Sequence, residues 1–212
     1  MTKIYVGYDE SNNNSVPEYH VFVHSINNAY AQEVKEKPFL TKGKKRREGV
    51  KEIFDEMSNE LDFRYVVLFD DVIKRLNEVE QKQSQKLKKI LVLYTYLKSM
   101  NFNSDKIDML LDGFIGNKTQ TQEVIMFLQK YFPNAGVYTK GGRRGQGGDV
   151  KFPLINYADR IAYQFLKEFN KRGLGVFKNH NKSLVNLTSP KRLYPNVDEF
   201  IILYEQFKAS IN

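Results

Sequence analysis

The sequence predicts an α/β domain in which helices cover a mixed sheet, and two features of the chain support this. Residues 3–11 and 19–26 alternate apolar and polar side chains and are joined by a polar turn. Such alternation is typical of half-buried strands, and the short connection favours a hairpin. Short apolar runs and segments with helical spacing then alternate along the chain, which indicates strands connected by helices.

The composition fits one folded domain with a basic surface. The 212 residues are 41% hydrophobic, and no linker of domain-separating length interrupts them, so a single domain over residues 1–212 is expected. Cysteine is absent, which excludes disulfides and zinc–thiolate sites and fits a cytoplasmic location. The chain has no apolar run of about 18 residues and no signal peptide, so no membrane span is expected.

The net charge indicates the class of partner. Thirty-three Lys and Arg residues against 25 Asp and Glu residues give a formal net charge of +8. This balance favours a polyanion, with nucleic acid as the first choice and a membrane surface as the second. A basic soluble protein without such a partner is the alternative.

The remaining elements follow from apolar spacing. Apolar runs predict strands over residues 63–69, 106–114 and 137–139. Helical spacing predicts helices over residues 47–60, 72–100, 120–131, 152–167 and 197–209, with a break in the second within the polar segment 78–89. Asp70 and Asp71 are expected to cap the second helix, with an extended acidic site as the alternative.

Several carboxylates occupy positions where rigid structure would hold them. Asp9 and Glu10 end the first strand, and Asp112 ends the strand 106–114, where Gly113 permits a sharp exit. A carboxylate held at a sheet edge in this way suits metal binding. Asp159 lies at the margin of the apolar arc of helix 152–167, so it is partly desolvated and needs a partner. The alternatives are a solvated turn for Asp9 and a salt bridge for Asp159.

Two basic segments are candidates for contact with phosphates. The first, Lys42-Gly-Lys-Lys-Arg-Arg47, contains Lys44, Lys45, Arg46 and Arg47. The second, residues 140–149, sets Arg143 and Arg144 among glycines, without the Gly-Lys-Ser/Thr ending of a nucleotide-binding loop. Both predict contacts with a nucleic-acid backbone, and the alternative for both is a solvated surface loop.

The order and spacing of these motifs resemble the ribonuclease H-like superfamily, nearest to ribonuclease HII and to uncharacterised relatives that open with an Asp-Glu-Ser motif. The resemblance covers about residues 3–170 and leaves residues 171–212 as a C-terminal helical extension. It depends on four motifs, which are Tyr8-Asp-Glu-Ser11, Leu111-Asp-Gly113, Gly148-Asp149 and Asn156-Tyr-Ala-Asp-Arg-Ile-Ala162.

The resemblance implies a metal-dependent nuclease. Asp9, Asp112 and Asp159 would bind two Mg²⁺ or Mn²⁺ ions, and Glu10 matches the catalytic glutamate that follows the first aspartate of ribonuclease HII. In that enzyme a glycine-rich, arginine-containing turn comes next, whereas Ser11-Asn-Asn-Asn stands here. Specificity for RNA–DNA junctions is therefore not implied. The alternative is a non-catalytic module on the same fold that binds nucleic acid or a protein.

Overall fold

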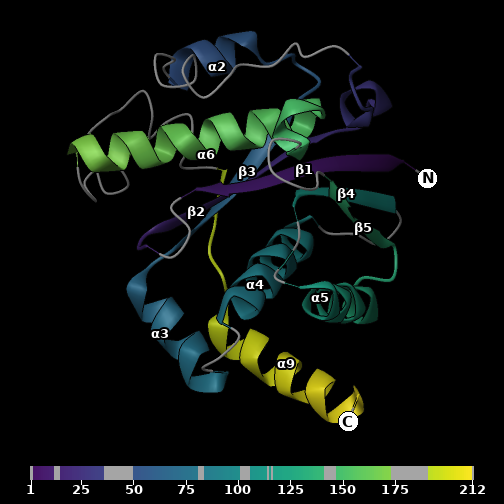
Figure 1. Ribbon diagram of the computed structural model, residues 1–212, viewed down its shortest axis with the longest axis vertical. Helices are drawn as coiled ribbons and strands as arrows, with labels where there is room; N and C mark the ends of the chain where they lie inside the picture. Colours follow the sequence, from purple (N-terminus) through teal and green to yellow (C-terminus); the bar gives the residue numbers. More distant parts are fainter. Residues whose placement is uncertain are drawn as a thin grey trace.

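One mixed sheet forms the centre of the protein. The computed structural model describes residues 2–11, 15–35, 50–80, 84–100, 106–113, 115, 117–140, 147–172 and 191–211 (Figure 1). In this part of the chain six strands pair in the order β5-β4-β1-β2-β3-β6. Their bounds are Lys3–Ser11 (β1), Glu18–Ser25 (β2), Asp62–Leu68 (β3), Lys106–Asp112 (β4), Ala135–Lys140 (β5) and Arg192–Leu193 (β6).

The strand directions confirm the predicted fold class. β2 is antiparallel to both β1 and β3, whereas β1 with β4, β4 with β5, and β3 with β6 are parallel pairs. A mixed sheet flanked by helices was expected, and the six strands of the described residues form such a sheet. The predicted strands are all present, and no apolar pattern predicted the two-residue strand β6.

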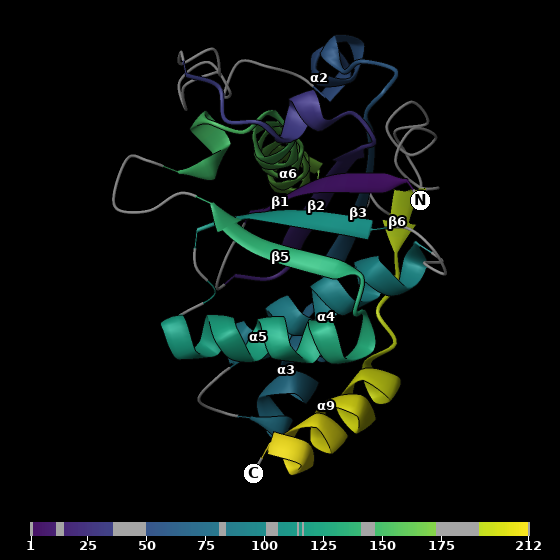
Figure 2. The same ribbon diagram turned by 90° about the vertical axis from the view of Figure 1, so that its right-hand side faces the viewer.

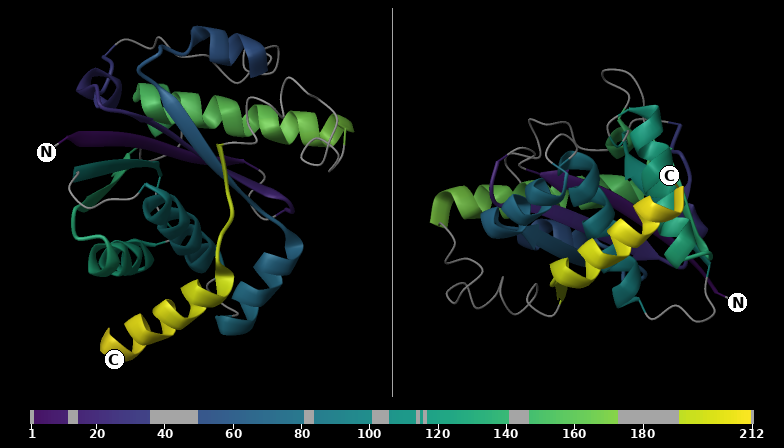
Figure 3. Two further views of the ribbon diagram at one scale, coloured as in Figure 1. Left: turned by 180° about the vertical axis from the view of Figure 1, so that it is seen from behind. Right: turned by 90° about the horizontal axis from the view of Figure 1, so that it is seen from below.

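Helices cover both faces of the sheet. On one face lie α2 (Val50–Glu56) and α6 (Pro153–Arg172), and Figure 2 shows α6 end-on above β1. The other face is covered by α4 (Ser84–Ser99) and α5 (Lys118–Tyr131), with α3 (Asp70–Val79) and α9 (Val197–Ile211) packed against them. Figure 3 shows α9 on the outer side of this layer, away from α6. None of the described helices is long and apolar enough to cross a membrane.

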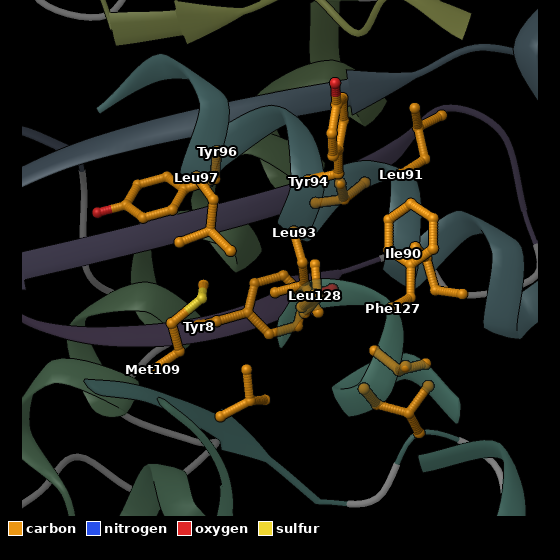
Figure 4. Packing of buried hydrophobic residues seen from close by; sticks show 14 of the residues in the cluster. Tyr8, Ile90, Leu91, Leu93, Tyr94, Tyr96, Leu97, Met109, Phe127 and Leu128 are labelled. Carbon is orange, nitrogen blue, oxygen red and sulfur yellow. The ribbon is translucent and has the colours of Figure 1, made fainter. Parts of the chain in front are cut away.

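The larger core lies between the sheet and α4, α5 and α9. Tyr8 and Met109 of the sheet face Leu93 of α4 and Leu128 of α5 (Figure 4). The predicted C-terminal extension contributes to this core, because Phe200 and other apolar side chains of α9 are buried in it. Burying one such large apolar side chain stabilises the fold by about 1.5–3 kcal/mol relative to leaving it exposed.

Two details of the helices differ from or refine the expectations. The predicted helix 72–100 is divided as expected, into α3 and α4. The predicted cap at Asp70 and Asp71 is wrong, because Phe69 is the N-cap residue and makes no side-chain cap hydrogen bond. The two carboxylates lie in the first turn, where they stabilise the positive end of the helix dipole, and Asp70 pairs with Lys74 at 2.5 Å.

β1 and α6 meet at Gly7 without a side chain between them. A Cβ atom at Gly7 would lie 2.2 Å from the carbonyl carbon of Leu154 and 2.5 Å from the amide nitrogen of Ile155. Both atoms belong to the backbone of α6, so no side-chain rotation can relieve the clash. Only glycine permits α6 to lie this close to the sheet.

We expect Gly7→Ala to lower the free energy of unfolding by about 3 kcal/mol or more, because α6 would have to move away from β1. The measurement is urea unfolding followed by circular dichroism. Gly136→Ala is the matched control, since the nearest atom there is the hydroxyl of the half-exposed Tyr138, at 2.7 Å, which can rotate away. Equal unfolding midpoints for the two variants would contradict the close packing at Gly7.

Candidate active site

Asp9 and Asp112 lie side by side at the ends of two neighbouring parallel strands. β1 and β4 pair in parallel with Tyr8 opposite Leu111, so Asp9 and Asp112 are the next positions in the same register. Tyr8 and Leu111 point into the core on the α4 side, and side chains alternate along a strand. Both aspartates therefore point to the α6 side. The structure thus brings together two of the predicted site residues.

The two carboxylates are held in a poorly hydrated, negatively charged environment. Burial raises the pKa of Asp9 well above its usual range, and the charges of Glu10 and Asp112 raise it further. Burial also raises the pKa of Asp112; the charges of Asp149 and Glu10 add to this rise, and the Gly148 amide opposes it. Carboxylates in such a group remain ionised together only when cations neutralise them.

Gly147-Gly148-Asp149 brings a further acid to Asp112. Gly148 is buried, and its N–H donates to Oδ1 of Asp112 at 2.5 Å. A Cβ atom at Gly148 would lie 3.0 Å from the same oxygen, so a larger residue would crowd the carboxylate. Asp149 lies in the short helix η2 (Gly148–Val150) before α6, and its backbone carbonyl accepts a hydrogen bond from the side-chain amide of Asn156 at 2.9 Å.

Asp149 was absent from the predicted set of acids, although its motif was noted. The signal that would have found it is an aspartate that directly follows two glycines at the start of a helix. Glycine allows the backbone to approach a neighbouring carboxylate, which brings the next side chain with it.

Glu10 points to the opposite face of the sheet from Asp9. Its carboxylate forms an ion pair with Lys89 of α4, and both side chains are nearly buried. The Lys89 ammonium also lies 4.9 Å from the centre of the Tyr8 ring. The backbone N–H of Glu10 donates to Oδ1 of Asp9 at 2.8 Å, so Glu10 supports Asp9 through its main chain.

Asp159 lies on α6, one turn after Ile155, and is half-buried. Ile155 packs with Leu110 and Phe152, close to the end of β4. The strongest repulsive charges on Asp9 come from Glu10 and Asp112, and those on Asp112 come from Asp149 and Glu10. Convergence of Asp159 with Asp9 and Asp112 therefore stays a prediction.

The donor types suit a hard divalent cation, since carboxylate oxygens are the ligands that Mg²⁺ and Mn²⁺ prefer. Within the described ranges, no three His, Cys, Asp or Glu side chains are arranged to hold a metal ion as they stand. Two carboxylates are nevertheless a common protein contribution to a magnesium site, with waters and substrate phosphates completing the coordination. Asp9 and Asp112 fit that pattern.

The predicted phosphate contacts at Lys44, Lys45, Arg46, Arg47, Arg143 and Arg144 lie outside the described residues.

Comparison with known proteins assigns no family. No family model matches the sequence, and no curated protein matches it. Among solved structures, the chain is similar to ribonuclease HII from Archaeoglobus fulgidus in its complex with PCNA. The sequence identity is 14% and the TM-score 0.47, over 80% of this chain and 78% of that chain. A likeness of this size concerns the fold at most.

We expect Asp9→Asn to leave the metal-free melting temperature at pH 7 unchanged or to raise it. The folded pKa of Asp9 lies above its unfolded value of about 3.9, so its ionisation destabilises the folded state increasingly as pH rises from the lower value to the higher. Asparagine removes that charge and keeps an oxygen that can accept from the Glu10 N–H. The measurement is thermal melting at several pH values from about 4 to 8 in the presence of a chelator.

The matched control is Asp108→Asn, on the same face of β4 but four residues before its end. Asp108 pairs with Lys3 at 2.6 Å, so this variant loses an attraction instead of a repulsion. A clear fall in melting temperature for Asp9→Asn alone would mean that Asp9 stabilises the fold.

Proposed function

We propose that this protein is a metal-dependent nuclease that hydrolyses phosphodiester bonds. The observation that supports it best is the pair of poorly hydrated carboxylates, Asp9 and Asp112, at the ends of adjacent parallel strands, with Asp149 beside Asp112. The mutual repulsion of such carboxylates is unfavourable when they are ionised alone, and bound cations would neutralise it. Perturbed carboxylates of this kind are typical of functional sites.

Mg²⁺ or Mn²⁺ would bind to Asp9 and Asp112, with Asp149 and Asp159 as further ligands. When bound, two such ions would activate a water molecule and stabilise the leaving oxygen of the phosphodiester.

The chain's own contribution is to fix the carboxylates before the metal arrives. The Gly148 N–H holds one oxygen of Asp112, and the Glu10 N–H holds one oxygen of Asp9. The backbone N–H of Asp149 is a further donor to the Asp112 carboxylate. Fixed ligands reduce the reorganisation that accompanies binding and reaction.

Glu10 would have to leave Lys89 to act as a catalytic residue beside Asp9. Its present pairing places it on the α4 side, where it contributes negative charge to the site through space. A charge contribution requires no contact with the metal.

A non-catalytic binding module on the same fold is the second candidate. It is favoured by the pairing of Glu10 with Lys89 and by the lack, among the described side chains, of a three-ligand group ready for a metal. Such a module would bind nucleic acid through its basic segments without cutting it. Cleavage assays distinguish the two candidates.

We expect Asp112→Asn to reduce Mn²⁺-dependent cleavage by at least two orders of magnitude, because the metals supply several kcal/mol of transition-state stabilisation. The substitution keeps the acceptor for the Gly148 N–H, so the local fold should persist. The assay uses single strands, duplexes and RNA–DNA hybrids with Mg²⁺ and Mn²⁺, and calorimetric titration with Mn²⁺ measures metal affinity directly. Asp70→Asn, at an exposed carboxylate of α3 that pairs with Lys74 away from the site, is the control and should cleave like the unmodified protein.

If the unmodified protein cuts none of these substrates, the binding module becomes the better description. Equal cleavage by Asp112→Asn and the unmodified protein would remove Asp112 from the site.

Affinity for nucleic acid should fall steeply as salt rises from about 50 to 200 mM, because lysines and arginines that contact phosphates release counterions. The residues proposed for these contacts are Lys44, Lys45, Arg46, Arg47, Arg143 and Arg144. Fluorescence anisotropy with a labelled strand measures the salt slope. Replacing Arg143 and Arg144 by glutamine should lower the slope by about 2, and an unchanged slope would exclude them.

A further inference from the structure

A pocket of about 360 Å³ opens beside the candidate active site, on the same face of the sheet. Its walls come from β1, β4, β5, the short helix η1 (Asn28–Ala31) and the residues before α6. They include Tyr5, Gln32, Leu110, Tyr138, Lys140 and Phe152. This volume lies within the range of sites that bind small molecules.

The pocket lies next to the carboxylates along β4 and β5. Leu110 lies two residues before Asp112, which at the rise of a strand is roughly 7 Å along β4. Lys140 is the strand partner of Asp112, and a Cβ atom at Gly148 would lie 3.2 Å from the Cβ of Lys140. A ligand in the pocket would therefore reach the carboxylates without leaving the surface of the sheet.

The lining suits a flat aromatic ligand with an attached phosphate. The Tyr138 side chain is 46% exposed, and its hydroxyl end occupies the space that Gly136 leaves vacant. The Lys140 ammonium lies 5.9 Å from the centre of the Tyr138 ring and 5.2 Å from that of Phe152. The pocket thus presents ring surface for stacking and a cation on the side of Asp112.

The acidic side chains of the pocket are already neutralised. Asp108 pairs with Lys3 at 2.6 Å, and Glu33 pairs with Lys151 at 2.7 Å. Asn28 and Gln32 add side-chain amides, which can donate to and accept from the edge of a base. The pocket therefore does not repel an anion as the carboxylates of the site do.

We propose that this pocket binds an unpaired nucleobase of the strand whose phosphate lies at Asp9 and Asp112. The inference rests on the proposed nuclease function and gives it a substrate class, a single strand or an unpaired nucleotide. A base within a duplex presents no face for stacking, whereas an unstacked base can enter a pocket and stack on tyrosine. Lys140 would contact the phosphate attached to that base.

Tyr138→Ala tests the pocket apart from catalysis. Binding of the four 5′-mononucleotides is measured by calorimetry for the unmodified protein, Tyr138→Ala and Tyr138→Phe, without divalent metal. We expect Tyr138→Phe, which keeps the ring, to bind with little change, and Tyr138→Ala to lose about five- to 150-fold in affinity. Tyr194→Ala, at a tyrosine that is 71% exposed and outside the pocket, is the control and should bind normally.

The outcomes separate the pocket from the nuclease. Nucleotide binding that depends on Tyr138, in a protein that cuts nothing, would support the pocket and overturn catalysis. Cleavage that is equal for Tyr138→Ala and the unmodified protein, on single strands and on duplexes, would overturn the pocket and leave the nuclease standing. The pocket proposal is overturned if no mononucleotide binds to the unmodified protein. It is also overturned if Tyr138→Ala binds mononucleotides as tightly as the unmodified protein.

Discussion

The contact of α6 with β1 at Gly7 is the constraint on which the site depends. It sets the distance between the start of α6 and the sheet, because the backbone at Leu154 occupies the place of a side chain. The turn before α6 then reaches the end of β4, and its Gly148 N–H meets Asp112. The same packing brings Phe152 and Ile155 against Leu110, which forms the floor of the neighbouring pocket. A side chain at position 7 would therefore disturb the helix, the carboxylate and the pocket together.

The opposite face of the sheet contains buried charge. Lys88 of α4 pairs with Glu18, and the imidazole of His20 lies between Glu18 and the Tyr8 hydroxyl. Buried ion pairs add little net stability, but removing one partner leaves an uncompensated charge and costs about 3–5 kcal/mol. These pairs thus penalise any other register of α4 against the sheet.

Local patterns predicted the strands and the acids at their ends, because alternation and chain direction depend on neighbouring residues alone. The positions of Asp9 and Asp112 were predicted in this way. The burial of Lys88 and Lys89 in α4 was not predicted, because a lysine is expected to be solvated unless a partner is known. Their partners, Glu18 and Glu10, are placed beside them only by the folded sheet. Asp149 was missed for a related reason: its closeness to Asp112 depends on a backbone contact of Gly148 across 36 positions of the chain. Spacing alone cannot supply such contacts.

The charges around the site link metal and strand. A phosphate placed directly against Asp9, Asp112 and Asp149 would meet strong repulsion, so the strand can lie there only with cations in between. The adjoining pocket has its acids paired and offers Lys140 beside aromatic rings, so the proposed base would bind there without any metal. Stacking would then hold the strand while the metals complete their coordination with its phosphate. In this arrangement the pocket would select an unpaired base, and the acidic strand ends would make the binding of its phosphate depend on the metal.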